Sequence, residues 1–273
     1  MPFTDHGGLR YYTFANLTRH GVVHGVFTRR GGASPRPWAS LNMGSTVGDD
    51  WGRVQFNIRR AFGALGLSVA SRYDAWLVHG RDAVVAAQPR PVNSPAPPPK
   101  ADIILTANPA VTLVMRYADC VPILLYDPRQ QAIGLAHAGW RGTVVGTAAA
   151  AVEAMQEAFG SRPADLLAAI GPAIGPDHYE VGAEVVAQVR EAFGAQSEAL
   201  LPRYGERRHF DLWQANRLQL ERAGVPSGHI EMAEICTACH VADWYSHRAE
   251  QGKTGRFGVL LALPDAPRRL PDG

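Results

Sequence analysis

The sequence lacks the features that would mark a membrane, secreted or disulfide-linked protein. No apolar run reaches transmembrane length, and the N-terminus has no basic head followed by an apolar stretch, as a secretion signal would. We therefore expect a cytoplasmic protein with no membrane partner. The 273 residues include three cysteines, and in a reducing compartment this argues against a disulfide framework. The thiols are then available for metal binding or nucleophilic chemistry.

Lysine and excess charge of one sign are also scarce. The formal net charge is +2 and the basic residues are scattered along the chain, so we expect no nucleic-acid partner. Arginine supplies nearly all of the positive charge, and it is well suited to binding phosphate and carboxylate groups. With 46% hydrophobic residues, the chain can bury a large core, and we expect a single domain over residues 1–273, as a monomer or weak homodimer.

The order of predicted elements is an alternation of strands and helices. Taken alone, this alternation favours a doubly wound sheet. The proline-rich tract 88–100 cannot form the interior of a helix or a central strand, and we interpret it as an exposed loop within the domain. Strands are predicted at 21–27, 121–126, 132–136, 166–170, 230–235 and 257–263, and helices at 50–65, 144–159, 183–193 and 212–223.

Three soft metal ligands lie on apolar segments: His79 in WLVHG, Cys120 in YADCVP and His137 in LAHAGWRG. Two imidazoles and one thiolate would leave a tetrahedral zinc ion one open position, as in catalytic zinc sites. A tight turn centred on Pro128 and Arg129 would place Cys120 directly opposite His137, with Cβ atoms roughly 4.5–5.5 Å apart. Nothing local fixes the position of His79. Each residue alone also fits a structural role in the core.

The segment after His137 suggests an anion site. A glycine-bearing turn leads into the helix 144–159, with Thr143 as the expected N-cap and Gly160 as the stop. Free backbone N–H groups and the helix dipole would favour an anion there, and Arg141 could add a bidentate contact. Alternatively, the glycines only form a tight turn and Arg141 lies on the surface.

A second cysteine motif is present near the C-terminus. Cys236-Thr237-Ala238-Cys239-His240 matches the C-x-x-C-H of haem attachment, but that chemistry needs export from the cytoplasm. As half of a zinc site it has no matching second half, and as a redox pair it has no thioredoxin context. We interpret Cys236 as a strand-end cysteine and assign no role to Cys239.

Specific motifs occur in a fixed order along most of the chain. They are Thr28-Arg29-Arg30-Gly31-Gly32-Ala33-Ser34 with Leu41-Asn42, Val78-His79-Gly80, Ala101-Asp102, Ala118-Asp119-Cys120-Val121-Pro122, His137-Ala138-Gly139-Trp140-Arg141-Gly142, Ile170-Gly171-Pro172, Tyr179-Glu180-Val181-Gly182, Cys236-Thr237 and Gly255-Arg256. In these motifs the chain resembles the laccase-domain purine nucleoside phosphorylase family, also called YfiH-like or polyphenol-oxidase-like. The resemblance runs from about His20 to Leu263.

The resemblance implies an α+β fold, with mixed β-sheets packed between helices in a single large domain, in place of a doubly wound sheet. It implies zinc at His79, Cys120 and His137. The implied activity is phosphorolysis of adenosine, inosine, guanosine and S-methyl-5'-thioadenosine, with deamination of adenosine. The chain departs from the family pattern at Leu77, where glutamine is common, and at His247 in a Tyr-Arg-Arg pattern, and both positions bear on substrate preference.

Roles in such a reaction can be assigned from motif position. Asp119, beside a ligand, could shuttle a proton, Arg30 or Arg141 could neutralise phosphate, and Asn42 could bind purine or ribose. Three alternatives remain open. Cys120 could be the thiolate nucleophile of a cysteine hydrolase, activated by His137 or His79. Copper with Met115 as axial ligand would give a polyphenol oxidase, although a laccase needs more clustered histidines. The protein could also be a metal-stabilised binding module.

Overall fold

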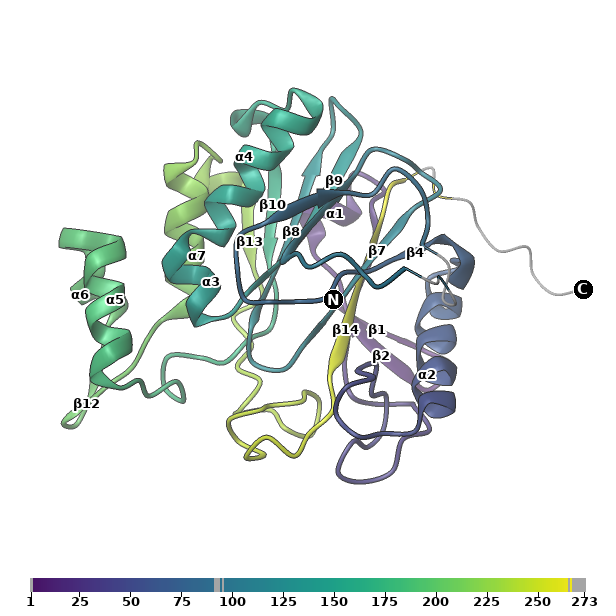
Figure 1. Ribbon diagram of the computed structural model, residues 1–273, viewed down its shortest axis with the longest axis horizontal. Helices are drawn as coiled ribbons and strands as arrows, with labels where there is room; N and C mark the ends of the chain where they lie inside the picture. The colour runs from purple at the N-terminus through teal and green to yellow at the C-terminus, as the bar shows by residue number, and fades with distance from the viewer. Residues whose placement is uncertain (1, 91–93, 95, 265, 267–273) are drawn as a thin grey trace, which may run out of the picture.

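Two six-stranded mixed sheets form the centre of the protein, and helices cover their outer faces (Figure 1). The computed structural model describes residues 2–90, 94, 96–264 and 266. The first sheet has the order β1 (Phe3–His6), β2 (Leu9–Tyr12), β3 (Val23–Phe27), β14 (Phe257–Ala262), β7 (Thr112–Tyr117) and β4 (Arg72–Tyr73). The second has the order β13 (Ile230–Met232), β10 (Leu167–Ile170), β8 (Val121–Asp127), β9 (Ala132–Ala138), β6 (Ile103–Thr106) and β5 (Ala83–Val85).

The helices are α1 (Ala15–Thr18), α2 (Trp51–Ala64), α3 (Trp140–Val145), α4 (Thr147–Phe159), α5 (Ala183–Phe193), α6 (Ser197–Leu200) and α7 (Leu212–Arg222), and a small hairpin pairs β11 (Arg203–Tyr204) with β12 (Arg207–Arg208). The short α1 packs Leu17 into the core between the two sheets, and the other helices lie outside the sheets. Figure 1 shows α3, α4 and α7 on the side of the second sheet and α2 beside the first. Within the described residues, no helix has the length and apolar character to span a bilayer.

The mixed sheets confirm the α+β class and correct the expectation from alternation alone. β8 and β9 are joined by a hairpin and pair antiparallel, whereas a doubly wound sheet needs helical crossovers between parallel neighbours. Parallel pairing is confined to β10 with β13, β5 with β6 and β4 with β7 among the described strands. Among the described residues, β4 to β9 also follow one another with no α-helix between them, so the predicted alternation does not hold there.

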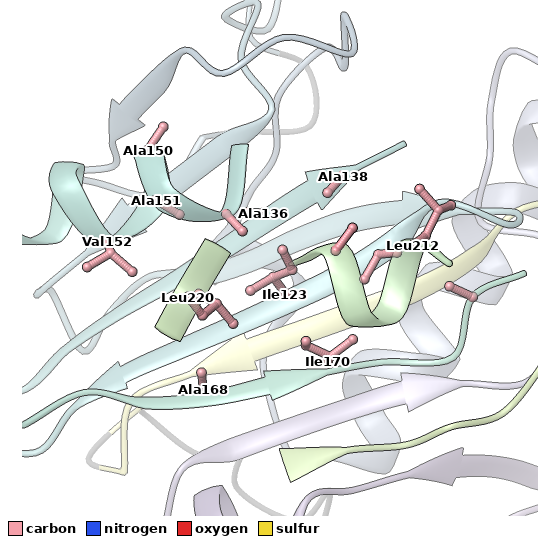
Figure 2. Close-up of a cluster of buried hydrophobic side chains, with 14 of the residues drawn as sticks. Ile123, Ala136, Ala138, Ala150, Ala151, Val152, Ala168, Ile170, Leu212 and Leu220 are labelled. Carbon is pink, nitrogen blue, oxygen red and sulfur yellow. The ribbon is translucent and has the colours of Figure 1, made fainter. Parts of the chain in front are cut away.

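Strand β8 is buried on both faces, and its alternate residues supply two different cores. Ile123 and Leu125 pack with α4 and α7 on the outer face of the second sheet, and Figure 2 shows this cluster around Ile123. Leu124 and Tyr126 belong to the core between the two sheets. Because successive side chains of a strand point to opposite faces, one apolar run can hold three layers together.

Helix α2 confirms the predicted helix 50–65. Val54, Ile58 and Phe62 lie in a third core against the first sheet, as the spacing of apolar residues predicts. The Asp50 side chain accepts a hydrogen bond from the N–H of Arg53 and caps the helix.

The hairpin of β8 and β9 is confirmed, but the predicted register is wrong by two residues. The loop has four residues, and the Asp127 carboxylate accepts the N–H groups of Arg129 and Gln130. Pro122, not Cys120, therefore lies opposite His137. A shift by an even number of residues keeps every side chain on its predicted face. Cys120 consequently stays on the His137 side of the hairpin, at a diagonal position.

The predicted helix 144–159 is also corrected at its start. The helical segment begins at Trp140, and Gly146, in the left-handed conformation with φ 89°, divides it into α3 and α4. Thr143 is therefore inside α3 and is not an N-cap; its hydroxyl accepts a hydrogen bond from Asn216 instead. Gly160 ends α4 in the left-handed conformation, as predicted. The N-terminus at this turn therefore belongs to the six-residue α3, and the longer α4 begins at Thr147, beyond residue 143.

Of the proline-rich tract 88–100, residues 91–93 and 95 lie outside the described residues, and the remainder are exposed or half-buried. The tract is joined to the segment after β4, because the N–H of Trp76 donates to the carbonyl of Pro99. It is therefore placed beside the residues that lead to His79.

The core contains a histidine that should make stability depend on pH. His24 in β3 is buried; its Nε2 accepts the N–H of Phe14 and its Nδ1 bonds the carbonyl of Val22, so the neutral ring is fully satisfied. Burial lowers the pKa of His24 from 6.5 to about 4, against smaller opposing effects of the Val22 carbonyl and Glu231. The unfolded chain therefore binds this proton at a higher pH than the folded chain does.

We expect the free energy of unfolding to fall by about 3 kcal/mol as the pH drops from 6.5 towards 4 through this residue. Urea unfolding over this pH range, with an NMR titration of the His24 ring, measures both quantities. A His6→Gln variant, which changes an exposed histidine, should leave the pH dependence unaltered. An NMR midpoint for His24 near 6.5 would contradict the expectation.

Candidate metal centre

The three candidate ligands meet where the chain passes between the two sheets. His79 lies between β4 of the first sheet and β5 of the second, and Cys120 lies between β7 and β8. His137 is in β9, directly beside them. One ligand atom from each of the three side chains lies within 4.8 Å of the other two. The sequence could not position His79, and the fold brings it to the other two through this crossing.

One buried carboxylate positions two of these residues. Oδ1 of Asp102 lies 2.9 Å from Nδ1 of His137, so the Nε2 of that ring is free to face the centre. Oδ2 accepts the N–H groups of Val78 at 3.0 Å and Gly80 at 2.8 Å, on either side of His79. His79 itself has a left-handed backbone with φ 60°, a strained conformation for a non-glycine residue. The bonds to its neighbours hold it there.

Electrostatics favour a thiolate at Cys120. Burial would raise the pKa of this thiol, but the charge of His137 and hydrogen bonds from His137 and His79 outweigh burial and lower it. For His137, burial would lower the pKa, but Cys120 and Asp102 outweigh it and raise it. Asp102 keeps a lowered pKa because the bonds from His137, Gly80 and Val78 outweigh its burial. A divalent cation would take the place of the imidazolium charge in this arrangement.

Gly139 makes room for the three side chains. A Cβ atom at this position would lie 2.9 Å from Sγ of Cys120 and 3.1 Å from Cδ2 of His79. Both distances are too short for ordinary contact, so a side chain at residue 139 would displace two candidate ligands. Gly139 is therefore required by the three candidate ligands as well as by the start of α3.

The centre opens into a cavity of about 930 Å³. Six arginines and two aspartates line it, and three of the arginines surround the buried Asp74: Arg116 at 2.6 Å, Arg90 at 3.7 Å and Arg72 at 3.8 Å. Burial would raise the pKa of Asp74, but these guanidinium groups outweigh it and lower the pKa. One carboxylate cannot neutralise three arginines, so this part of the cavity is positively charged.

Two of the remaining predicted site residues line the cavity and two do not. Asp119 is buried at its wall; its Oδ1 accepts the Thr237 hydroxyl at 2.6 Å, and its Oδ2 accepts the N–H of Arg248 at 2.7 Å. Arg141 lines the cavity with its guanidinium 5.1 Å from the centre of the Trp140 ring.

Arg30 and Asn42 are absent from the described lining residues. Arg30 forms an ion pair with Asp243, and Asn42 is buried, where its amide bonds Gly44, Asp49 and the N–H of Arg256. Asn42 thus supports two lining residues, Gly44 and Arg256, and does not itself reach the cavity. Met115, the residue considered as an axial copper ligand, is also outside the lining; its sulfur accepts the hydroxyl of Tyr117 in the core.

Sequence reasoning missed the role of Asp102 and the arginines around Asp74. Asp102 precedes β6, a strand of four buried residues of which three are apolar, and a buried carboxylate at a strand start is a signal for a histidine partner. No comparable local signal marks Arg72 or Arg116, because they come together only when β4 pairs with β7.

Comparison with known proteins assigns the class of fold first. The crystal structure of the Bacillus licheniformis hypothetical protein YfiH superposes with a TM-score of 0.88 at 32% sequence identity, covering 96% of this chain and 99% of that one. Purine nucleoside phosphorylase YlmD of Geobacillus stearothermophilus is 40% identical over 254 residues, which is 88% of this chain and 90% of the relative. Purine nucleoside phosphorylase of Deinococcus radiodurans is 40% identical over 243 residues, 89% of this chain and 90% of the relative.

The sequence model of a family described as multi-copper polyphenol oxidoreductase laccase matches residues 23–264. The chain belongs to this family, which is the laccase-domain, YfiH-like family that its motifs predicted. The family description names copper and polyphenol oxidation, whereas the two relatives are named as nucleoside phosphorylases. The descriptions therefore differ in the reaction, and they leave the metal to the chemistry of the residues in the centre.

Asp102 should control metal affinity without being a ligand. An Asp102→Asn variant has a single acceptor oxygen and cannot serve both the His137 ring and the two N–H groups beside His79. We expect zinc affinity to fall by roughly 10–100-fold, as for other residues that orient metal-binding histidines. Competition with a chromophoric chelator measures the affinity. An Asp82→Asn variant, changed at an exposed neighbouring carboxylate, should bind zinc as the wild type does, and equal affinity in both variants would disprove the role of Asp102.

Proposed function

We propose that the chain is a zinc-dependent purine nucleoside phosphorylase. Its reaction would cleave the N-glycosidic bond of adenosine, inosine, guanosine and S-methyl-5'-thioadenosine with phosphate, and the same centre would deaminate adenosine. The observation that carries the proposal is a centre of two histidines and one cysteine opening into an arginine-lined cavity. The names of the relatives agree with this reaction.

The residues of the centre suit zinc. Two imidazole nitrogens and one thiolate are the ligand types that zinc prefers, and three protein ligands leave one position open. Asp102 holds the His137 ring in the tautomer whose Nε2 can bind a cation, since Nδ1 donates to the carboxylate. A bound zinc ion would supply Lewis acidity towards the substrate. Hard oxygen-binding cations such as magnesium do not match this donor set.

The arginines around Asp74 form the proposed phosphate subsite. Arg72 is buried, lines the cavity, and has no hydrogen-bond partner for its Nε and Nη1 in the described structure. Unpaired buried N–H groups cost free energy, and phosphate oxygens would satisfy them with strong charge-assisted bonds. Arg116 and Arg90 add positive charge beside it. The charge of phosphate would thus be balanced before it attacks the sugar carbon.

The cavity also offers the purine an apolar surface. Trp51 and Trp76 line the cavity and are each about half exposed, at 53% and 51%. Such rings offer stacking surfaces to a base. The cavity volume lies within the range of about 300–1,000 Å³ that is usual for small-molecule sites. It has room for a nucleoside and a phosphate together.

Asp119 is the proposed proton carrier, with Arg141 as a further cationic contact. The bonds from Thr237 and Arg248 fix the carboxylate at the cavity wall directly beside Cys120. A fixed carboxylate next to the reacting centre can accept a proton from the nucleophile and return it to the leaving purine.

The proposed reaction requires both phosphate and the metal centre. We expect wild-type protein of measured zinc content to release free base from adenosine, inosine and S-methyl-5'-thioadenosine only with phosphate, and ammonia from adenosine without it. Cys120→Ala should lose the zinc bound at this centre and both activities. Met115→Leu should keep them, because Met115 lies in the core. Base release without phosphate would indicate hydrolysis in place of phosphorolysis. Full activity in Cys120→Ala would show that the centre of His79, Cys120 and His137 is not where the reactions occur.

The phosphate subsite has its own test. Arg72→Gln should raise the KM for phosphate by roughly 10–100-fold, the equivalent of losing charge-assisted bonds of about 1.5–3 kcal/mol, with a smaller effect on the KM for nucleoside. Arg90→Gln, at a less buried position, tests the same cluster if the first variant is unstable. Arg59→Gln changes an exposed arginine outside the cavity lining and serves as the control. An unchanged KM for phosphate in both cluster variants would show that phosphate does not bind at these arginines.

A cysteine hydrolase is the second candidate, because Cys120, His137 and Asp102 have the order of a nucleophile, a base and an orienting carboxylate. The lowered pKa of Cys120 favours it. The two functions differ in their response to chelation: a hydrolase of this kind keeps its activity when metal is removed and loses it on alkylation of Cys120. The phosphorylase loses activity on chelation and regains it with zinc.

A further inference from the structure

Four donor side chains come together outside the cavity, on two loops that the sequence places far apart. Asp177 and His178 follow β10, whereas Cys236 and Cys239 follow β13. One donor atom from each lies within 4.8 Å of those of the others. We propose that these four residues form a second zinc site with a structural role. The C-x-x-C motif thus has its second half in the loop after β10.

The distances between the donor atoms are close to those of a tetrahedral zinc site. Bonds of about 2.0–2.3 Å from zinc to N, O and S place tetrahedral ligand atoms about 3.3–3.8 Å apart. Nδ1 of His178 lies 3.4 Å from Sγ of Cys239 and 3.9 Å from Sγ of Cys236, and Sγ of Cys239 lies 3.4 Å from Oδ2 of Asp177. Nδ1 of His178 and Oδ2 of Asp177 are closer, at 2.9 Å. All four donor atoms lie within 4.8 Å of one another.

Two backbone N–H groups are directed at the sulfur of Cys236. The sulfur accepts the N–H of Gly175 at 3.1 Å and the N–H of Cys239 at 3.4 Å. N–H groups directed at a ligand sulfur hold it in a fixed position, as the outer partners of metal ligands do. Cys236 is the buried member of the group, and the other three are exposed, so an ion can reach the site from solvent.

Gly175 allows the two loops to approach. A Cβ atom there would lie 2.7 Å from Oδ1 of Asp177 and 3.1 Å from Cβ of Cys236. The loops continue adjacent parallel strands, and the pairing extends beyond them through a bridge between Ala173 and Cys236. The four donors are therefore positioned by the sheet, not by chance contacts of long side chains.

The donor set points to zinc and to a closed site. Two thiolates, one imidazole and one carboxylate are soft enough to exclude magnesium and calcium, and four protein ligands leave no open position. Binding releases the two thiol protons. A dication removes the cost of placing these anionic groups together.

The site would act on the cavity through Asp119. The carbonyl of Asp119 accepts the N–H of Ile174, in the first loop, and its carboxylate accepts the hydroxyl of Thr237, in the second. An ion that joins the two loops therefore fixes both contacts to Asp119. Its role is positional and involves no contact with substrate.

Zinc stoichiometry tests the proposal on the full chain. After equilibration with excess zinc and exhaustive dialysis, we expect two zinc ions per wild-type chain and one in each of Cys239→Ala, His178→Ala and Cys120→Ala. The double variant Cys120→Ala/Cys239→Ala should contain none. His240→Ala, which changes the exposed histidine next to the motif, should keep two. Circular dichroism verifies that each variant is folded.

Cobalt provides a second readout that does not depend on activity. Cys120→Ala loaded with Co(II) should show thiolate-to-cobalt charge transfer and the visible bands of a tetrahedral site, and Cys120→Ala/Cys239→Ala should lose both. One zinc ion in the wild type and none in Cys120→Ala would overturn the proposal. So would two ions retained in both Cys239→Ala and His178→Ala, or a Cys236–Cys239 disulfide in freshly purified protein, detected as a loss of two mass units.

Discussion

The arrangement of the candidate metal centre depends on the carboxylate of Asp102. Through one oxygen it fixes the ring of His137, and through the other it holds the backbone on both sides of His79. A buried carboxylate is costly unless it is hydrogen-bonded, and here both oxygens are satisfied by the groups that the site needs in place. The same three bonds thus stabilise the carboxylate, select the tautomer of His137 and hold His79 in a conformation that it would otherwise avoid.

The location of the centre follows from the layers of the fold. Two sheets share a core, and the chain passes between them in the short segments that carry His79 and Cys120. Such crossings leave the regular hydrogen bonding of a sheet, so their side chains can turn towards a common point. His137, at the end of a fully buried strand, supplies a rigid third position. Catalytic groups on segments anchored at both ends by sheets keep their geometry better than groups on free loops.

Local pattern predicted much of this fold, and long-range pairing accounts for what it missed. The spacing of Val54, Ile58 and Phe62 predicted α2, and apolar runs around a proline turn predicted the β8–β9 hairpin. The turn residues were insufficient to fix the loop length, so the register was wrong by two residues. The face was still right, because burial on one side of a strand specifies parity more strongly than exact pairing. The same parity kept Cys120 and His137 on one side of the hairpin, whereas His79 was supplied by the resemblance to the family.

The residues that sequence reasoning missed share one property: their partners lie on strands that are not neighbours in the sequence. Asp102 needs β6 beside β9, and the arginines around Asp74 need β4 beside β7. Asp177 and His178 need β10 beside β13 to meet the two cysteines. A search for zinc motifs assumes short, regular spacings, and this group does not have them. Of these residues, only Asp102 could have been anticipated, because the Ala101-Asp102 motif is part of the resemblance to the family.

Asp119 connects the centre, the cavity and the second group of donors. Its backbone is left-handed with φ 81°, which costs a non-glycine residue about 1–2 kcal/mol. Glycine would remove that strain, but it would also remove the carboxylate that bonds Thr237 and the N–H of Arg248. Those bonds join three separate loops at the residue before Cys120. The strain is therefore maintained because a side chain is needed there, and the left-handed turn directs that side chain to the loops while Cys120 faces His137.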